Sequence, residues 1–179
     1  MTLALVRHGR TAWNRERRMQ GQSDIALDPV GEAQAEAAGR LLATAVWTRI
    51  VSSPLRRASQ SAEIIRRHMP NAEYRVHDGL VERHYGEADG LQVTEAWERW
   101  PDQNYPGAES VAATADRAAS ALRELLRDDV DTVVVAHGTL LRLGIEAVTG
   151  HPCSRLSNGD VVLLEGSEAL GYTARWLTE

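Results

Sequence analysis

Two short apolar runs, each leading into a histidine and a glycine, most constrain the fold of this chain. Residues 3–6 lead through Arg7 into His8-Gly9, and residues 132–136 lead into His137-Gly138. Continuous apolar runs of this length are typical of strands buried on both faces of a parallel sheet. Ligands bind beyond the carboxyl ends of such strands. We therefore expect both histidines to face one pocket.

Segments with helical and strand-like patterns alternate along the rest of the chain. Asp28-Pro29 predicts the start of a helix that runs to about residue 45. Its expected apolar face comprises Val30, Ala33, Ala37, Leu41 and Leu42. We expect further strands at residues 50–53, 74–77 and 132–136, helices starting at Pro54 and covering 110–127 and 139–148, and a hairpin of residues 160–165 and 172–177. This order predicts a three-layer α/β/α sandwich with a mostly parallel central sheet and a C-terminal edge hairpin.

Length and composition narrow the class of protein. The 179 residues suit a single domain spanning residues 1–179. All 20 basic residues are arginine and are outnumbered by 25 acidic residues, which argues against nucleic-acid and membrane partners. Cys153 is the only cysteine, and no basic leader or membrane-length apolar run is present, so we expect a soluble, cytoplasmic protein.

The residue types near the expected pocket suit phosphoryl chemistry. Arginine presents a planar, permanently charged fork that matches phosphate oxygens, and Arg7 and one of the adjacent Arg56 and Arg57 are positioned to supply it. The helix after His137 is expected to add free backbone N–H groups. Two histidines with a carboxylate also suit a metal triad, but two arginines beside a divalent cation would repel it. We expect neither metal nor cofactor.

A neutral imidazole in such a pocket can attack phosphorus and form a phosphohistidine. His8 is the favoured nucleophile, provided that its second ring nitrogen donates to a carbonyl group. Glu82 is the candidate that protonates the leaving oxygen.

Several sequence blocks together resemble the histidine phosphatase superfamily, also called the phosphoglycerate-mutase-like family. The blocks span residues 5–14, 18–21, 52–62, 80–90, 106–110 and 135–138, in family order. The resemblance implies a phosphorylated His8, a phosphoryl group held by Arg7, Arg57 and His137, and Glu82 as acid and then base. It selects Arg57 over Arg56. The expected outer substrate contacts are Asn14, Gln20, Gly21, Arg10, Tyr85 and Gly138.

Arg10 departs from the family pattern, which usually has glutamate or glutamine after Arg-His-Gly. Its charge either favours a more anionic substrate or simply faces solvent. Near the expected pocket, Trp97 is interpreted as a packing residue, whereas the roles of Trp100 and Tyr105 stay open.

The family includes phosphatases and mutases, which differ in whether water or a bound phosphoglycerate accepts the phosphoryl group. The segment from Glu82 to Gly86 resembles cofactor-dependent phosphoglycerate mutases. Those mutases carry a longer insertion with lysine and paired arginines, which the short segment between Gly90 and Glu109 lacks. The sequence therefore favours a metal-independent phosphatase of small phosphorylated metabolites over a mutase. A non-catalytic phospho-ligand sensor ranks third, and the oligomeric state is not predicted.

Overall fold

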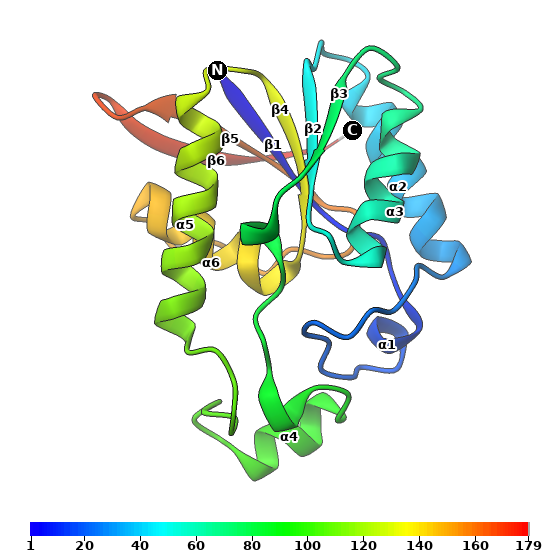
Figure 1. The fold of residues 1–179 in the computed structure, drawn as a ribbon, viewed down its shortest axis with the longest axis vertical. Helices are drawn as coiled ribbons and strands as arrows, with labels where there is room; N and C mark the ends of the chain where they lie inside the picture. The colour runs from blue at the N-terminus through cyan, green and yellow to red at the C-terminus, as the bar shows by residue number, and fades with distance from the viewer. Residues whose placement is uncertain (179) are drawn as a thin grey trace.

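Helices cover both faces of one six-stranded sheet in the computed structural model, which describes residues 1–178 (Figure 1). The strands are β1 (Thr2–Arg7), β2 (Arg49–Ser52), β3 (Glu73–Val76), β4 (Thr132–Ala136), β5 (Val161–Ser167) and β6 (Gly171–Leu177). Their order is β3-β2-β4-β1-β5-β6. The first four strands run parallel, and β5 is antiparallel to β1 and pairs with β6 as an edge hairpin. The predicted fold class is confirmed.

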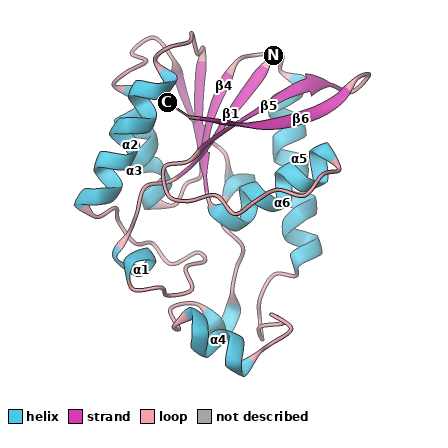
Figure 2. Cartoon of the chain, turned by 180° about the vertical axis from the view of Figure 1, so that it is seen from behind, coloured by secondary structure: helices cyan, strands magenta, loops and turns pink. Residues whose placement is uncertain are grey.

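Two helices pack on each face of the sheet (Figure 2). On one face lie α2 (Pro29–Leu42) and α3 (Arg56–Arg66), and on the other α5 (Val111–Arg127) and α6 (Gly138–Thr149). Capping side chains fix two helix starts, because Asp28 accepts the N–H of Gly31 and Ser110 accepts the N–H of Ala113. Two smaller helices, α1 (Ala12–Arg15) and α4 (Val93–Arg99), lie beyond one end of the sheet (Figure 1).

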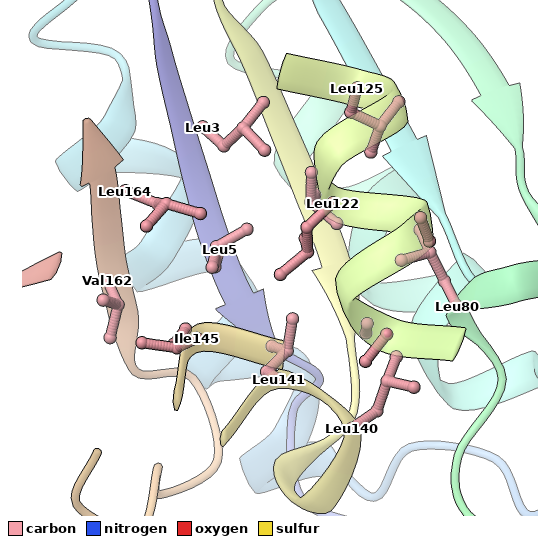
Figure 3. Packing of buried hydrophobic residues seen from close by; sticks show 14 of the residues in the cluster. Leu3, Leu5, Leu80, Leu122, Leu125, Leu140, Leu141, Ile145, Val162 and Leu164 are labelled. Carbon is pink, nitrogen blue, oxygen red and sulfur yellow. The ribbon is translucent and has the colours of Figure 1, made fainter. Parts of the chain in front are cut away.

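Alternating side chains of β1 serve two separate cores. Leu3 and Leu5 pack toward α5 and α6, as Figure 3 shows, whereas Ala4 and Val6 belong to the cluster under α2 and α3. Both sets are almost completely buried. A strand buried on both faces must be apolar throughout, which explains the continuous run in the sequence.

The pairing of β1 with β4 places the two histidines together. Arg7 is opposite Ala136 in the parallel register, and the N–H of His8 donates to the carbonyl of Ala136. His8 and His137 therefore leave neighbouring strands at the same carboxyl edge. The end of the sheet near α1 and α4 is this edge (Figure 1).

The structure corrects the predicted apolar face of α2. Val30 and Ala33 are exposed, and the buried residues of the helix are Gly31, Ala35, Ala38, Gly39 and Leu42. An added Cβ on Gly31 would lie 2.1 Å from the carbonyl oxygen of Arg10, so the helix approaches the loop after β1 backbone to backbone. This contact turns Gly31 toward the loop and leaves Val30 and Ala33 on the exposed face, whereas Leu42 is buried as predicted.

Two helix boundaries also differ from the prediction. Helix α2 ends at Leu42 rather than near residue 45, and α3 begins at Arg56 rather than at Pro54. Helix α4 was not predicted. No helix within residues 1–178 is long and apolar enough to cross a membrane.

Leu122→Ala should destabilise the protein by about 2–5 kcal/mol, the usual cost of removing a buried leucine side chain. Leu122 is 1% exposed and packs in the core between α5 and the sheet (Figure 3). Urea unfolding followed by circular dichroism measures the change. Leu170→Ala is the matched control, because Leu170 is 91% exposed. Equal stabilities of the two variants would contradict this account of the core.

Candidate active site

The peptide of Gly9 fixes the ring of His8 directly after β1. The Nδ1 atom of His8 lies 2.7 Å from the carbonyl oxygen of Gly9, and the N–H of Gly9 donates to Ser61 Oγ at 3.0 Å. A carbonyl oxygen only accepts hydrogen bonds, so Nδ1 must carry the proton. The lone pair of a neutral His8 is therefore on Nε2.

Arg57 approaches that lone pair from the first turn of α3. Its Nε lies 3.2 Å from His8 Nε2, and its two terminal nitrogens donate to the carbonyl oxygens of Ser23 and Gly21. Arg57 is fully buried. Burial lowers its pKa to about 10, so the guanidinium remains charged at neutral pH.

His137 lies next to His8, with ring centroids 5.2 Å apart and planes inclined by 61°. Its Nε2 is 2.8 Å from Ser53 Oγ, in the segment that follows β2. Its Nδ1 is buried and has no hydrogen-bond partner among the described residues. A buried imidazole nitrogen without a partner is suited to bind an incoming oxygen or proton.

Both histidines are neutral at physiological pH. Burial lowers the pKa of His8 well below its usual value, and the charges of Arg57 and Arg7 lower it further. Burial also lowers the pKa of His137, again with a contribution from Arg57. A neutral His8 keeps the lone pair that a nucleophile needs.

Glu82 is buried opposite the start of α6. Its Oε1 accepts the N–H groups of Arg83 at 2.8 Å and Leu140 at 3.0 Å, whereas Oε2 accepts only the N–H of Thr139, at 3.1 Å. Burial raises the pKa of Glu82, although these hydrogen bonds and Arg57 oppose the shift. A proton on this carboxyl group is expected on Oε2, which has fewer donors around it.

This arrangement limits the expectation that the start of α6 offers free N–H groups to phosphate, because only the N–H of Gly138 is left without a partner within residues 1–178. The carboxylate of Glu82 takes the N–H groups of Thr139 and Leu140. The carboxyl group of Glu82 therefore lies at the positive end of the helix dipole.

Arg7 extends from the end of β1 toward Gly138. Its Nη1 donates to the carbonyl oxygen of Leu156 at 2.6 Å, and its buried Nε has no partner among residues 1–178. A Cβ on Gly138 would lie 3.1 Å from that Nε. Glycine at this position leaves room beside the guanidinium.

A cavity of about 280 Å³ opens beside Arg7 and Glu82. Six of the predicted site residues line it: Arg7, Asn14, Gln20, Glu82, Tyr85 and Gly138. His8, His137 and Arg57 do not line it and lie buried, with Arg57 against the His8 lone pair. A phosphate reaching His8 must therefore displace the guanidinium of Arg57 from Nε2.

Two predicted outer contacts are not at this cavity. Arg10 pairs with the helix-capping Asp28, with Nε 2.8 Å from Oδ2, and Gly21 holds Arg57 through its carbonyl oxygen. The structure thus gives Arg10 a role at the start of α2, and its charge is partly compensated there.

The aromatic residues near the cavity also differ from the sequence interpretation. Trp97 was expected to pack, but it is 49% exposed and lines the cavity. Tyr105 is buried and also lines the cavity, and Trp100 packs edge-on against it at 5.8 Å between ring centroids.

Several residues of the site were not singled out from the sequence. Ser53, Ser61 and Thr139 contact His137, Gly9 and Tyr85, respectively, and Arg142 and Arg155 line the cavity. Ser53 and Ser61 lie within the sequence block of residues 52–62 that resembles the family, so the sequence could have indicated them. Arg155 lies in a loop before β5, and nothing in its local sequence marks it.

The pKa shift of His8 predicts a measurable pH dependence of stability. Below pH 6.5 the unfolded chain binds a proton at His8 that the folded protein does not, so stability falls as the pH falls. For one such histidine the loss between pH 7 and pH 5 is about 2 kcal/mol. Glu82, whose pKa is raised, acts in the opposite direction.

Comparing the wild type with His8→Asn isolates this effect, because Glu82 and the other titrating groups are common to both. The wild type should lose about 2 kcal/mol more than the variant over this pH range in urea unfolding. Identical pH profiles would show that His8 titrates normally in the folded protein.

Comparison with known proteins confirms the family resemblance. The family model described as "Histidine phosphatase superfamily (branch 1)" matches residues 3–176. A Bacillus subtilis (strain 168) protein named "Uncharacterized phosphatase PhoE" is 36% identical over 152 residues, covering 83% of this chain and 77% of its own length. A Salmonella typhi protein named "Probable phosphoglycerate mutase GpmB" is 32% identical over 98% of this chain and 89% of its own.

Solved structures agree with this assignment. The vanadate (VO3) complex of mycobacterial glucosyl-3-phosphoglycerate phosphatase superposes with a TM-score of 0.88 at 28% identity, over 99% of each chain. This chain belongs to the histidine phosphatase superfamily.

Proposed function

We propose that this protein hydrolyses small phosphate monoesters through a phosphohistidine formed on His8, without a metal ion or cofactor. The observation that carries this proposal is the locked, neutral imidazole of His8, whose Nε2 lone pair meets a buried arginine. Family membership supports the same chemistry.

In the first step, the substrate phosphate enters beside Arg7 and draws the guanidinium of Arg57 away from His8. The freed Nε2 attacks phosphorus as the bond to the ester oxygen breaks. Glu82 transfers its proton to that oxygen, and the alcohol leaves. Arg7, Arg57 and His137 bind the three nonbridging oxygens during the transfer.

In the second step, Glu82 acts as a base. Its carboxylate, left negative by the first step, removes a proton from a water molecule that attacks the phosphorus of the phosphohistidine. The bond between phosphorus and Nε2 breaks, inorganic phosphate leaves, and Glu82 is protonated again. The raised pKa of Glu82 supports both roles.

A phosphoglycerate mutase is the second candidate. The mutase name of a relative at 32% identity favours it, as does the basic lining of the cavity, which includes Arg83, Arg142 and Arg155. The short segment between Gly90 and Glu109 favours the hydrolase, because it leaves less chain to exclude water. We also propose that the chain is a single domain that works in the cytoplasm, in line with its lone cysteine.

Substitution of His8 should abolish turnover. Purified protein should release phosphate from p-nitrophenyl phosphate in the presence of EDTA, and intact-mass spectrometry after rapid quenching should detect a phosphorylated protein. His8→Ala should lose both signals, whereas His151→Ala, a change at an exposed histidine, should keep them. Full activity of His8→Ala would contradict the phosphohistidine mechanism.

The effect of substituting Glu82 on the rate should depend on the leaving group of the substrate. Glu82→Gln should slow hydrolysis of an alkyl phosphate by about 10²–10⁴, the usual contribution of a positioned acid. Its effect on phosphorylation by p-nitrophenyl phosphate should be much smaller, because nitrophenolate leaves without a proton. Burst kinetics with the two substrates measure this step. Equal losses would mean that Glu82 does not protonate the leaving oxygen.

The two candidate functions differ in the phosphoryl acceptor. A hydrolase releases inorganic phosphate from 3-phosphoglycerate or other monoesters without an activator. A mutase interconverts 2- and 3-phosphoglycerate in the presence of 2,3-bisphosphoglycerate. Rapid interconversion with little phosphate release would replace our proposal with the second candidate, and binding without any turnover would indicate a sensor.

A further inference from the structure

A second cavity of about 360 Å³ adjoins the first and is strongly basic. Four of its nine lining residues are arginines: Arg7, Arg17, Arg18 and Arg155. No acidic side chain lines it among the described residues. The chain as a whole has a net charge of −5, so this concentration of positive charge is local. Such a cavity attracts anions.

Two of these arginines have no counter-charge. The side chains of Arg17 and Arg155 make no ion pair or hydrogen bond within residues 1–178, whereas Arg18 pairs with Glu16 and donates to the carbonyl of Gly90. The pKa of Arg7 is lowered, chiefly by burial and also by the charge of Arg155. An anion bound to Arg155 would reduce this repulsion.

The backbone of Arg17 adopts a conformation that usually selects glycine. Its φ is 55°, in the left-handed region, at the end of α1. The N–H of Arg17 bonds to the carbonyl of Asn14 and the N–H of Arg18 to that of Trp13, a helix-ending pattern that usually has glycine in the left-handed place. Arginine is strained here where glycine would not be, so backbone conformation does not explain it.

We propose that Arg17 and Arg155 bind a second anionic group of the substrate, remote from the phosphate that is transferred. The inference rests on the proposed phosphatase function and names its substrate class: phosphate monoesters that also carry a carboxylate or a second phosphate. Arg7, Asn14 and Arg155 line both cavities, so one molecule spans them, with Arg155 at their junction. Val93 and Trp97 of α4, which also line both, contact its carbon skeleton.

Matched substrate pairs test the proposal. Glycerol 3-phosphate and 3-phosphoglycerate differ by a carboxylate, and fructose 6-phosphate and fructose 1,6-bisphosphate differ by a second phosphate. The wild type should prefer the more anionic member of at least one pair by about five- to thirty-fold in kcat/KM, a range typical of solvent-accessible charge-assisted contacts. The pair that shows the preference identifies the anion. No preference in either pair would overturn the proposal.

Variants then assign the preference to these residues. Arg155→Gln and Arg17→Gly should each reduce this preference several-fold. Because the preference is a ratio of two kcat/KM values, a change in catalysis common to both substrates cancels from it. Arg15→Gln is the matched control, because Arg15 is also in this segment but lines neither cavity. Arg17→Gly should in addition raise the unfolding temperature by relieving the left-handed strain. If Arg155→Gln and Arg17→Gly both keep the preference for the more anionic substrate, its assignment to these two residues is wrong.

A binding measurement separates this inference from the proposed function. Calorimetric titration of His8→Ala with the same compounds measures affinity without turnover. His8→Ala should bind the more anionic member more tightly, and adding Arg155→Gln should remove this difference. That result would support the anion site even in a protein that hydrolyses nothing. Equal affinities beside normal hydrolysis of p-nitrophenyl phosphate by the wild type would overturn the anion site and leave the phosphatase proposal standing.

Discussion

The peptide of Gly9 is the contact on which the geometry of the site depends. Its carbonyl oxygen orients His8, its N–H is held by Ser61 of α3, and its Cα lies against Gly31 of α2. An added Cβ on Gly9 would lie 2.1 Å from the carbonyl oxygen of Gly31, so no larger residue fits without movement of the backbone. One strand and two helices therefore fix a single imidazole.

Burial gives His8 and Glu82 the protonation states that phosphoryl transfer needs. Loss of solvent disfavours any charge, which lowers the pKa of the imidazole and raises that of the carboxyl group. The pocket thus favours the neutral form of the nucleophile and shifts the carboxyl group toward its protonated form. The charge of Arg57 favours a lower pKa for both groups, so it adds to the shift of His8 and opposes that of Glu82. The pKa of Glu82 is still raised, because burial has the larger effect.

Features encoded in local sequence were predictable, and those that depend on distant chain segments were not. The buried runs of β1 and β4 follow from their apolar pattern, and the mostly parallel sheet follows from the alternation of strands with helices. The rotation of α2 does not, because glycine and alanine carry little hydrophobic signal although they allow the backbone contact that decides it. Arg155 reaches the cavity through the strand order, more than 140 residues after Arg7.

Arg155 brings positive charge to the cavity from outside the segment between Gly90 and Glu109. The segment between Gly90 and Glu109 has no arginine pair, but Arg17 and Arg155 supply positive charge from the loops beside α1 and before β5. Recognition of a second anion therefore does not require a long insertion. A short segment leaves water access open while the loops still supply charge, a combination that suits hydrolysis of doubly anionic esters better than transfer between them.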